Sequence, residues 1–300
     1  MPSSDDESQG DDGDSPADAF AVVGNETRAA IVRALGDARV EQGAPPVLSF
    51  SELRSRTDTD VGSSRFNYHL KQLLGRYVES VDDGYRMRAE GRRLYGMIRA
   101  GTFEESDAVH DVEAGFACHY CGADVTATIE RSMVSVECPD CAYTYGYSGA
   151  PPGAVEEASA DLEQVAEFYQ HRHLAFARGV CITCGNDLDT ELLDAETAPY
   201  ADADRRELSV YRSCARCGDQ RHLTLGTALL LDPEVVSFCH EHGVDVFATP
   251  LWELAFAATD RGVTIRSTDP WAVSLTIEFD GDALTLHVDG DLNVVERTRS

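Results

Sequence analysis

Apolar residues in the N-terminal third of the chain recur at the spacing of amphipathic helices. Phe20, Val23, Ile31 and Leu35 predict a first helix that ends at Gly36. The pattern continues with a short helix through Leu53 capped by Ser49 or Ser51, a helix over Ser63 to Leu74, two strands within Tyr77 to Arg88, and a helix over Glu90 to Ala100. This third therefore predicts three helices, a hairpin and a closing helix.

In the rest of the chain, some segments have apolar residues at helical spacing and others have the alternation typical of strands. Helical spacing is expected over Val155 to Arg178 with Gly179 as its stop, from a cap at Asp232 to His242, and from Pro250 to Ala258. Strands are expected within Val125 to Val136, Leu188 to Leu193, Leu208 to Arg212, and Val263 to Arg297 around the turn at Asp280-Gly281-Asp282. The predicted fold class is α+β with a β-rich C-terminal domain.

Charge is distributed unevenly along the chain. Acidic residues number 53 against 25 basic ones, and Lys71 is the single lysine, a bias that resembles proteins of salt-in halophiles. Residues 20–100 carry 13 bases and 10 acids and are the only net-positive segment, whereas residues 101–300 carry 12 bases and 36 acids. In molar salt the Debye length falls to about 3 Å. The net charge of -28 is therefore a weak argument against a nucleic-acid partner.

Several classes of protein are not expected. The chain has no run of 18 apolar residues and its first twenty positions are acidic, so we expect no membrane span, no secretory signal and a cytoplasmic location. It has no phosphate-cradling loop, no nucleophile elbow and no zincin motif, so we expect no enzyme.

The segment Ser63 to Leu74 divides into two faces when wound as a helix. Phe66, Leu70, Leu73 and Leu74 fall on an apolar side. The opposite side carries donors suited to base edges and phosphates, and the candidate DNA contacts are Ser64, Arg65, Asn67, Tyr68 and Lys71, with Arg86 and Arg88 on the hairpin as backbone contacts. A solvated face or a protein-docking module is the alternative. His69 is expected to pack and not to read bases.

The order of elements, with the run SSRFNYHLKQLLGRYVESVDDGYRMRAEGRRLY, resembles the ArsR-like winged-helix transcriptional regulators over roughly residues 20–100. His69-Leu70-x-x-Leu73 followed by a hairpin is similar to their recognition helix and wing. A closer likeness is to haloarchaeal helix-turn-helix regulators with a C-terminal domain of unknown function. The resemblance implies double-stranded DNA as partner and a homodimer. No cysteine lies between Met1 and Ala117, so metal sensing on the recognition helix is not expected.

Eight of nine cysteines form four C-x-x-C pairs. The pairs are Cys118/Cys121, Cys138/Cys141, Cys181/Cys184 and Cys214/Cys217. Two such knuckles complete a tetrahedral sulfur site, and the 16 residues between the first two pairs match a zinc ribbon. The second set has 29 intervening residues and predicts a longer ribbon. We expect two structural zinc ions, because four thiolates leave no position for a reacting water. A redox switch remains an alternative.

The sequence thus predicts a DNA-binding transcriptional regulator with structural zinc. The expected domains are an acidic tail (1–19), a winged helix-turn-helix (20–101), a zinc ribbon (115–147), a linking helix (155–179), a second ribbon-like module (180–230) and a C-terminal domain (231–300). The alternative is a basal factor or RNA-polymerase-binding adaptor resembling archaeal TFE-alpha, with the transcription machinery as partner. A small-molecule sensor or enzyme is a third reading, favoured by a pocket lined by His240, Trp252 or Trp271. Cys239 is expected to be a buried apolar residue.

Overall fold

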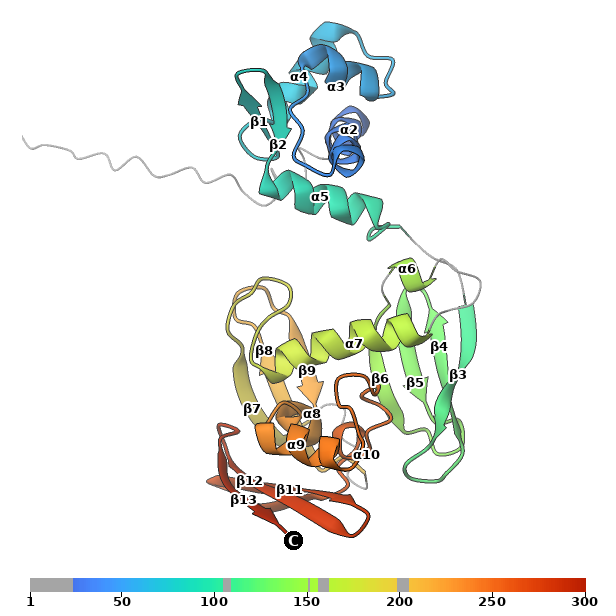
Figure 1. Cartoon of the computed structure of the whole chain (residues 1–300), viewed down its shortest axis with the longest axis vertical. Helices are drawn as coiled ribbons and strands as arrows, with labels where there is room; N and C mark the ends of the chain where they lie inside the picture. Colours follow the sequence, from blue (N-terminus) through green and yellow to red (C-terminus); the bar gives the residue numbers. More distant parts are fainter. Residues whose placement is uncertain (1–23, 105–108, 151, 156–161, 199–204) are drawn as a thin grey trace, which may run out of the picture. The chain divides into compact units, whose positions relative to one another are not determined.

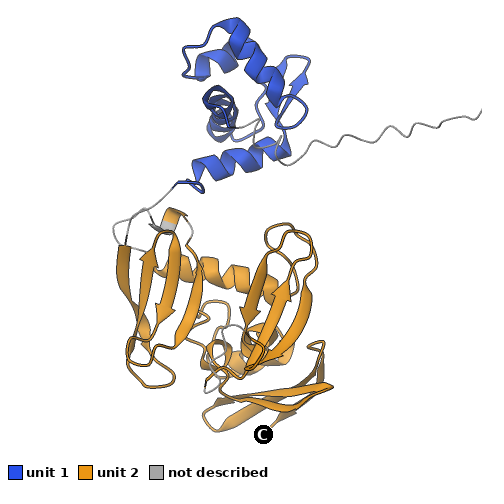
Figure 2. Cartoon of the chain, turned by 180° about the vertical axis from the view of Figure 1, so that it is seen from behind, with its two compact units in different colours: residues 1–104 blue, residues 105–300 orange. Residues whose placement is uncertain are grey.

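The computed structural model describes residues 24–104, 109–150, 152–155, 162–198 and 205–300. The chain divides into two compact units, residues 1–104 (unit 1) and residues 105–300 (unit 2) (Figure 2). The predicted acidic tail lies outside the described residues. The described residues of unit 1 form one hydrophobic core, and those of unit 2 form two.

Unit 1 contains the element order that its apolar pattern predicts (Figure 1). The elements are α2 (Glu26–Gln42), α3 (Phe50–Arg56), α4 (Ser63–Leu73), β1 (Val78–Val81), β2 (Gly84–Met87) and α5 (Ala89–Arg99). Strands β1 and β2 form an antiparallel hairpin with Val81 opposite Gly84. Ser49 caps α3 through a capping box with Glu52, which decides between the two expected capping residues.

The predicted first helix includes Phe20 and Val23, which lie outside the described residues, and its described part, α2, ends later than predicted. It begins at Glu26 behind the cap Asn25 and continues through Gly36, and the left-handed residue that ends it is Gly43 with a φ of 65°. Gly36 has a different task, since a Cβ there would lie 2.2 Å from the Tyr95 ring of α5. Gly36 therefore permits close packing of α2 against α5. The prediction that it ends the helix was wrong.

Unit 2 begins with a four-stranded antiparallel meander. Its strands are β3 (Val109–Ala117), β4 (Asp124–Glu130), β5 (Met133–Glu137) and β6 (Thr144–Gly149), in that order across the sheet. Alternate residues of β4, namely Val125, Ala127 and Ile129, are buried and place one sheet face on a core. The strands expected within Val125 to Val136 are confirmed.

A single long helix connects the two cores of unit 2. After α6 (Pro152–Val155), α7 (Leu162–Ala177) packs Val165 into the core of the first sheet and Phe176 into a second, larger core. The helix ends at Ala177, and the predicted stop residue Gly179 follows it with a φ of 77°. A three-stranded sheet follows, made of β7 (Asp189–Asp194), β8 (Leu208–Ser213) and β9 (Gln220–Leu223). Figure 1 shows α7 running from the first sheet to this second one.

The C-terminal part of unit 2 covers the larger core with helices and a meander. Its elements are α8 (Leu225–Leu229), α9 (Pro233–Glu241), α10 (Ala255–Ala258), β10 (Val263–Thr268), β11 (Trp271–Phe279), β12 (Asp282–Asp289) and β13 (Val294–Arg299). The Asp232 cap of α9 is confirmed. The strands expected from Val263 onward form an antiparallel sheet in chain order. The α+β class is therefore confirmed.

The helix expected from Pro250 to Ala258 is mostly absent. Only Ala255–Ala258 is helical, while the segment before it forms a turn in which the Glu253 N–H donates to the Pro250 carbonyl at 2.9 Å. This turn sends Leu251 into the larger core and Trp252 into the core of the first sheet. Two neighbouring apolar residues thus pack in two different cores. The spacing of apolar residues along the chain does not predict this arrangement.

Candidate metal centres and nucleic-acid interface

The first four predicted ligands meet at one end of the first sheet. Cys118 and Cys121 lie at the turn from β3 to β4, and Cys138 and Cys141 lie at the turn from β5 to β6. The Sγ atoms of Cys118 and Cys141 are 3.6 Å apart, and those of Cys121 and Cys138 are 3.4 Å apart. All four sulfurs lie within 4.8 Å of one another. We call this group cluster 1.

The other four cysteines form an equivalent group, cluster 2. Cys181 and Cys184 follow α7, and Cys214 and Cys217 lie in the turn from β8 to β9. The Sγ atoms of Cys181 and Cys217, and those of Cys184 and Cys214, are each 3.5 Å apart. The residues between the two pairs of cluster 2 contain β7, β8 and the segment that connects them. Both sets therefore bring their pairs together as the sequence predicts.

All four C-x-x-C pairs share one backbone geometry. In each pair the first cysteine is buried, and its N–H donates to the carbonyl five residues later at 2.7–3.0 Å. The N–H four residues later donates back to its carbonyl at 2.8–2.9 Å. The residue that closes each turn has a positive φ, and these residues are Gly122, Ala142, Gly185 and Gly218. Such a turn aims both sulfurs of a pair at one point.

The sulfur positions fit a tetrahedral metal ion. With metal–sulfur bonds of about 2.3 Å, four ligands at tetrahedral angles lie about 3.8 Å apart. The observed Sγ–Sγ separations of 3.4–3.6 Å are close to that value and far from the disulfide length of about 2.05 Å. No side chain with oxygen donors is needed to complete either set. Each cluster could hold a metal ion through four sulfurs, which favours a soft or borderline cation.

Cluster 1 has a partner that favours thiolate. The Tyr145 hydroxyl donates to Cys118 Sγ at 3.2 Å and accepts from the His119 N–H at 2.8 Å. Burial opposes ionisation of the Cys118 thiol, but this hydrogen bond and nearby backbone N–H groups outweigh it and lower the pKa to about 6. In cluster 2 the backbone N–H of Cys217 lowers the pKa of Cys214 to about 7. Thiolate is the metal-binding form, so one ligand in each cluster ionises readily, while burial and neighbouring thiols raise the pKa of Cys121, Cys141, Cys184 and Cys217.

In unit 1, α4 has the two faces that its sequence predicts. Phe66, Leu70 and Leu73 have no solvent exposure, and they pack in the core with α2 and α3. On the opposite side the exposed residues are Ser64, Arg65, Tyr68, Lys71 and Gln72, while Asn67 is half-buried. His69 is buried, and burial lowers its pKa, as expected for a packing histidine.

The two hairpin arginines are less available than the sequence suggested. Arg86 Nε lies 2.8 Å from Glu79 Oε1 across the β1–β2 pair, and Arg88 Nε lies 3.7 Å from a Glu90 carboxylate oxygen. Alternation along the strand revealed which way these side chains face, but not these acidic neighbours. Asp82 and Asp83 at the hairpin tip are exposed. Arg65 and Lys71 on α4 have no ion pair with a described residue.

Three interacting residues of unit 2 were not singled out by sequence reasoning. They are Tyr145, His119, whose Nε2 lies 2.9 Å from the Trp252 carbonyl oxygen, and Arg206, which lines a cavity described below. Only the proximity of His119 to Cys118 and of Tyr145 to Cys141 was a usable signal. Cys239 is buried in the larger core, and burial raises its pKa to about 11, which confirms its apolar role.

The fold and the two clusters define an α+β protein with two tetracysteine groups able to hold metal. A family model described as Domain of unknown function (DUF7351) matches residues 115–294, and the chain belongs to this family. A second model, described as Domain of unknown function (DUF7347), matches residues 16–98. The two matched ranges fall on either side of the division between unit 1 and unit 2. No curated protein and no solved structure matches the chain.

Within the described part of the chain, no helix has the length and apolar character that crossing a bilayer requires.

Proposed function

We propose that this chain is a DNA-binding transcriptional regulator whose unit 1 is a winged helix-turn-helix. The observation that carries the proposal is α4, a helix with one fully buried apolar face and an opposite face of exposed hydrogen-bond donors. In this role α4 enters the major groove, where Arg65 and Lys71 reach acceptors on bases and phosphates. Ser64, Asn67 and Tyr68 complete the proposed contact surface.

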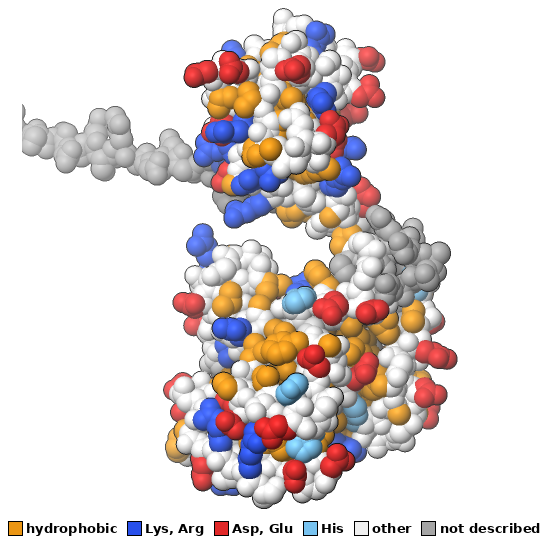
Figure 3. All heavy atoms as spheres, in the orientation of Figure 1, with side chains coloured by type: hydrophobic (Ala, Val, Ile, Leu, Met, Phe, Trp, Pro, Cys, Tyr) orange, Lys and Arg blue, Asp and Glu red, His pale blue; other side chains and the backbone are white. Residues whose placement is uncertain are grey.

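The charge of unit 1 supports this assignment. Residues 20–100 are the only net-positive segment, and on the face of unit 1 seen in Figure 3 Lys and Arg side chains lie among Asp and Glu side chains. Arg65 and Lys71 are free to meet phosphate without breaking an ion pair within the described structure. Arg86 and Arg88 must first give up acidic neighbours, so their proposed phosphate contacts contribute less.

We further propose that the resident metal of both clusters is zinc, in a structural role. All-sulfur tetrahedral sites with C-x-x-C knuckles are typical of structural zinc, and four thiolates leave no open coordination position for chemistry. Zinc binding to such sites contributes to folding because the unfolded chain does not hold the ligands together. Cys118, Cys121, Cys138 and Cys141 hold one ion in this proposal, and Cys181, Cys184, Cys214 and Cys217 hold the other.

The DNA proposal is tested by selecting bound sequences from random double-stranded DNA with the full chain. The double variant Arg65→Gln/Lys71→Gln should weaken binding to the selected site by at least about tenfold and reduce the salt dependence by roughly two counterions. The matched control Arg33→Gln/Arg93→Gln removes the same charge from exposed positions on α2 and α5. Equal losses in both double variants, or no enriched sequence at all, would overturn the assignment to α4.

Chromatin mapping separates the regulator from the adaptor alternative. Occupancy at a few promoters is expected of a regulator. Occupancy at every active promoter, lost when unit 2 is altered but not when Arg65 and Lys71 are replaced, would instead support a polymerase-binding role.

The zinc proposal is tested by metal content. Purified protein treated with a thiol-modifying reagent should release two zinc ions per chain to a metallochromic dye. A release below about one ion per chain contradicts it.

A further inference from the structure

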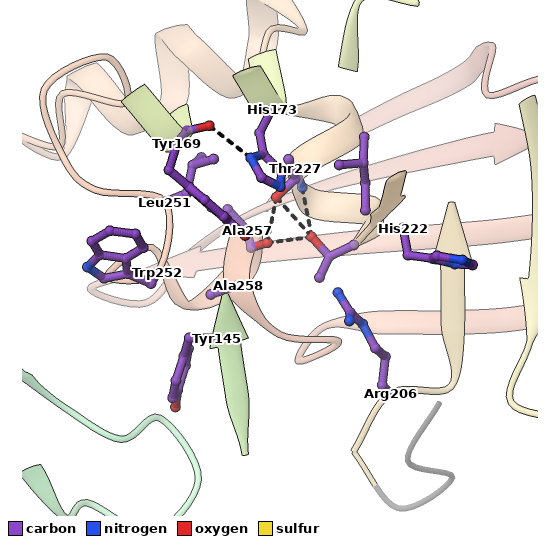
Figure 4. Close-up of a pocket in the computed structure, with 12 residues that line it drawn as sticks. Tyr145, Tyr169, His173, Arg206, His222, Thr227, Leu251, Trp252, Ala257 and Ala258 are labelled. Atoms are coloured by element: carbon purple, nitrogen blue, oxygen red, sulfur yellow. Dashed lines mark hydrogen bonds between the residues drawn. The ribbon is translucent and has the colours of Figure 1, made fainter. Parts of the chain in front are cut away.

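Unit 2 has a small, partly open cavity where four of its parts meet. Tyr145 of β6, Tyr169 and His173 of α7, Arg206 ahead of β8, Thr227 of α8 and Trp252 line it (Figure 4). Its volume is about 30 Å³, which is enough for one single-atom ion or one or two water molecules. The cavity therefore lies between the sheets that carry clusters 1 and 2, and not at either cluster.

The half-buried Arg206 side chain faces this cavity, and its guanidinium has no ion-pair partner among the described residues. Its Nε is buried and makes no hydrogen bond, and no carboxylate of a described residue lies within ion-pair distance of its nitrogens. In Figure 4 the side chain reaches toward the group around Ala257 and Thr227. Because the buried Nε–H has no acceptor in the protein and the half-buried guanidinium has no paired carboxylate, this arrangement favours an anion at the cavity.

The nearest acid does not supply that charge directly. Asp260 interacts electrostatically with Arg206 but lies beyond ion-pair distance, and its Oδ2 accepts the Leu208 N–H at 2.9 Å. Its Oδ1 is buried without a hydrogen-bond partner. Burial raises the pKa of Asp260, which weakens its claim to be a full counter-ion for Arg206.

The remaining wall offers Arg206 no negative charge. The Thr224 and Thr227 hydroxyls both donate to the Ala257 carbonyl, which occupies that acceptor. His173 Nδ1 lies 2.8 Å from the Tyr169 carbonyl oxygen, and burial lowers the pKa of His173 to about 4, so the ring is neutral near pH 7. The cavity thus combines one cation, neutral aromatic rings and hydroxyls already committed to a carbonyl.

We propose that this cavity binds a small monovalent inorganic anion of halide size at the Arg206 guanidinium. Its small volume suits a single-atom ion better than an organic acid or a nucleotide. The site is independent of the DNA-binding proposal, because every residue that forms it belongs to unit 2.

Occupancy of the site links the two cysteine modules. Tyr145, one wall of the cavity, donates to Cys118 Sγ of cluster 1. Arg205, next to Arg206, donates from Nη1 to the Cys141 carbonyl at 2.6 Å, and β8 continues from this segment to Cys214 of cluster 2. An anion held by Arg206 therefore stabilises the junction between the modules, and unit 2 should be more stable in a salt whose anion fits.

Trp252 supplies a direct readout, because its ring lines the cavity and is only 2 % exposed. In the full chain carrying Trp271→Phe, Trp252 is the remaining tryptophan. The variant is titrated with sodium bromide, a heavy-ion quencher, against sodium gluconate at constant ionic strength. We expect saturable quenching, since bulk bromide barely reaches a buried ring. Arg206→Gln in this background should raise the half-saturation concentration at least about tenfold, the loss expected for a charged hydrogen bond.

Two further variants and a crystal measurement keep the test decisive. Arg131→Gln removes an exposed arginine of unit 2 and should leave the titration unchanged, while Arg206→Lys keeps the charge and should retain part of the binding. Zinc content verifies that each variant is folded. Crystals of the unaltered chain grown in bromide should show an anomalous peak beside Arg206. Non-saturable quenching that is insensitive to Arg206→Gln, or a crystal with water alone beside Arg206, would overturn the proposal.

Discussion

Clusters 1 and 2 share a motif and a backbone geometry but differ in what surrounds them. Cluster 1 is enclosed by aromatic residues, among which Phe116, His119 and Tyr145 contact one another edge to face or tilted, as do Tyr120 and Tyr143. Near cluster 2 the described strands carry a single ring pair, Tyr211 of β8 and His222 of β9. The apolar residues that flank cluster 2, Val180 and Ile182, are exposed. The two clusters therefore have the same local turns but different surroundings.

The hydrogen bonds around the two clusters join residues at different separations along the sequence. From the knuckles of cluster 1, His119 contacts the Trp252 carbonyl and the Tyr143 hydroxyl donates to the Ala258 carbonyl at 2.9 Å, more than a hundred residues away. Around cluster 2 the side-chain hydrogen bonds found for the described knuckle residues stay local, as between Thr183 and Asp219 at 2.8 Å. A metal in cluster 1 therefore ties distant segments together, whereas one in cluster 2 orders two adjacent turns.

The largest expected effect is a difference between Cys138→Ser and Cys214→Ser. Both replace the buried first cysteine of the second pair of a cluster. Each should cost one zinc ion, but Cys138→Ser should also release the long-range contacts and lower the midpoint of thermal unfolding by more than about 10 °C. Cys214→Ser should lower it by only roughly 3 to 5 °C, because its turn can open locally. Tryptophan emission measures this, since both tryptophans lie in unit 2.

Cys239→Ala is the matched control for both serine variants. It removes a buried cysteine that belongs to neither cluster and should leave two zinc ions per chain. Equal midpoints for Cys138→Ser and Cys214→Ser would show that the surroundings of the clusters do not matter to the stability of unit 2.

A smaller effect is expected from Tyr145→Phe. The change removes the donor to Cys118 Sγ and the acceptor of the His119 N–H, and cluster 2 has no described equivalent. We expect a loss of about 1 to 2 kcal/mol in the free energy of unfolding and roughly tenfold weaker zinc retention by cluster 1. Competition with a chelator measures the retention. Tyr147→Phe, on the same strand but 66 % exposed, should change neither quantity.

The contrast between the clusters could not be predicted from the sequence, although the clusters themselves could. C-x-x-C spacing identifies ligands because two sulfurs must converge through one local turn. The tyrosine that contacts Cys118 and the carbonyls that anchor cluster 1 come from segments whose proximity depends on tertiary packing. Cys118 and Cys181 therefore look equivalent in sequence and differ in structure.

The same division between local and distant information holds in unit 1 and in the C-terminal segment. The faces of α4 follow from the spacing of Phe66, Leu70 and Leu73, since helical geometry alone sets which residues share a side. Gly36 was misread because its role depends on Tyr95 of another helix. The ion pair of Arg86 with Glu79 depends on hairpin register. In unit 1 the pattern thus predicted the described elements and the faces of α4, and tertiary neighbours decided which side chains are available.

The smallest predicted effects come from the residue that closes each knuckle. Three of the four closing residues are glycines, and Ala142 in cluster 1 has a φ of 56°, where an alanine is less favourable than a glycine. Ala142→Gly should raise the free energy of unfolding of unit 2 by about 0.5 to 1 kcal/mol, measured by denaturant titration with tryptophan emission. A neutral or destabilising result would mean that the extra conformational entropy of glycine in the unfolded chain outweighs the strain removed at this φ.

Gly218→Ala is the reciprocal change in cluster 2. Its φ is 77° and no described atom lies within 4 Å of the added Cβ, so the cost of about 1 kcal/mol arises from the backbone alone. Since we expect the knuckles of cluster 2 to open locally, this cost should appear as weaker zinc retention by cluster 2, with little change in the unfolding midpoint of unit 2. A midpoint shift as large as that of Ala142→Gly would contradict local opening, and with it the distinction between a metal that ties unit 2 together and one that orders two turns.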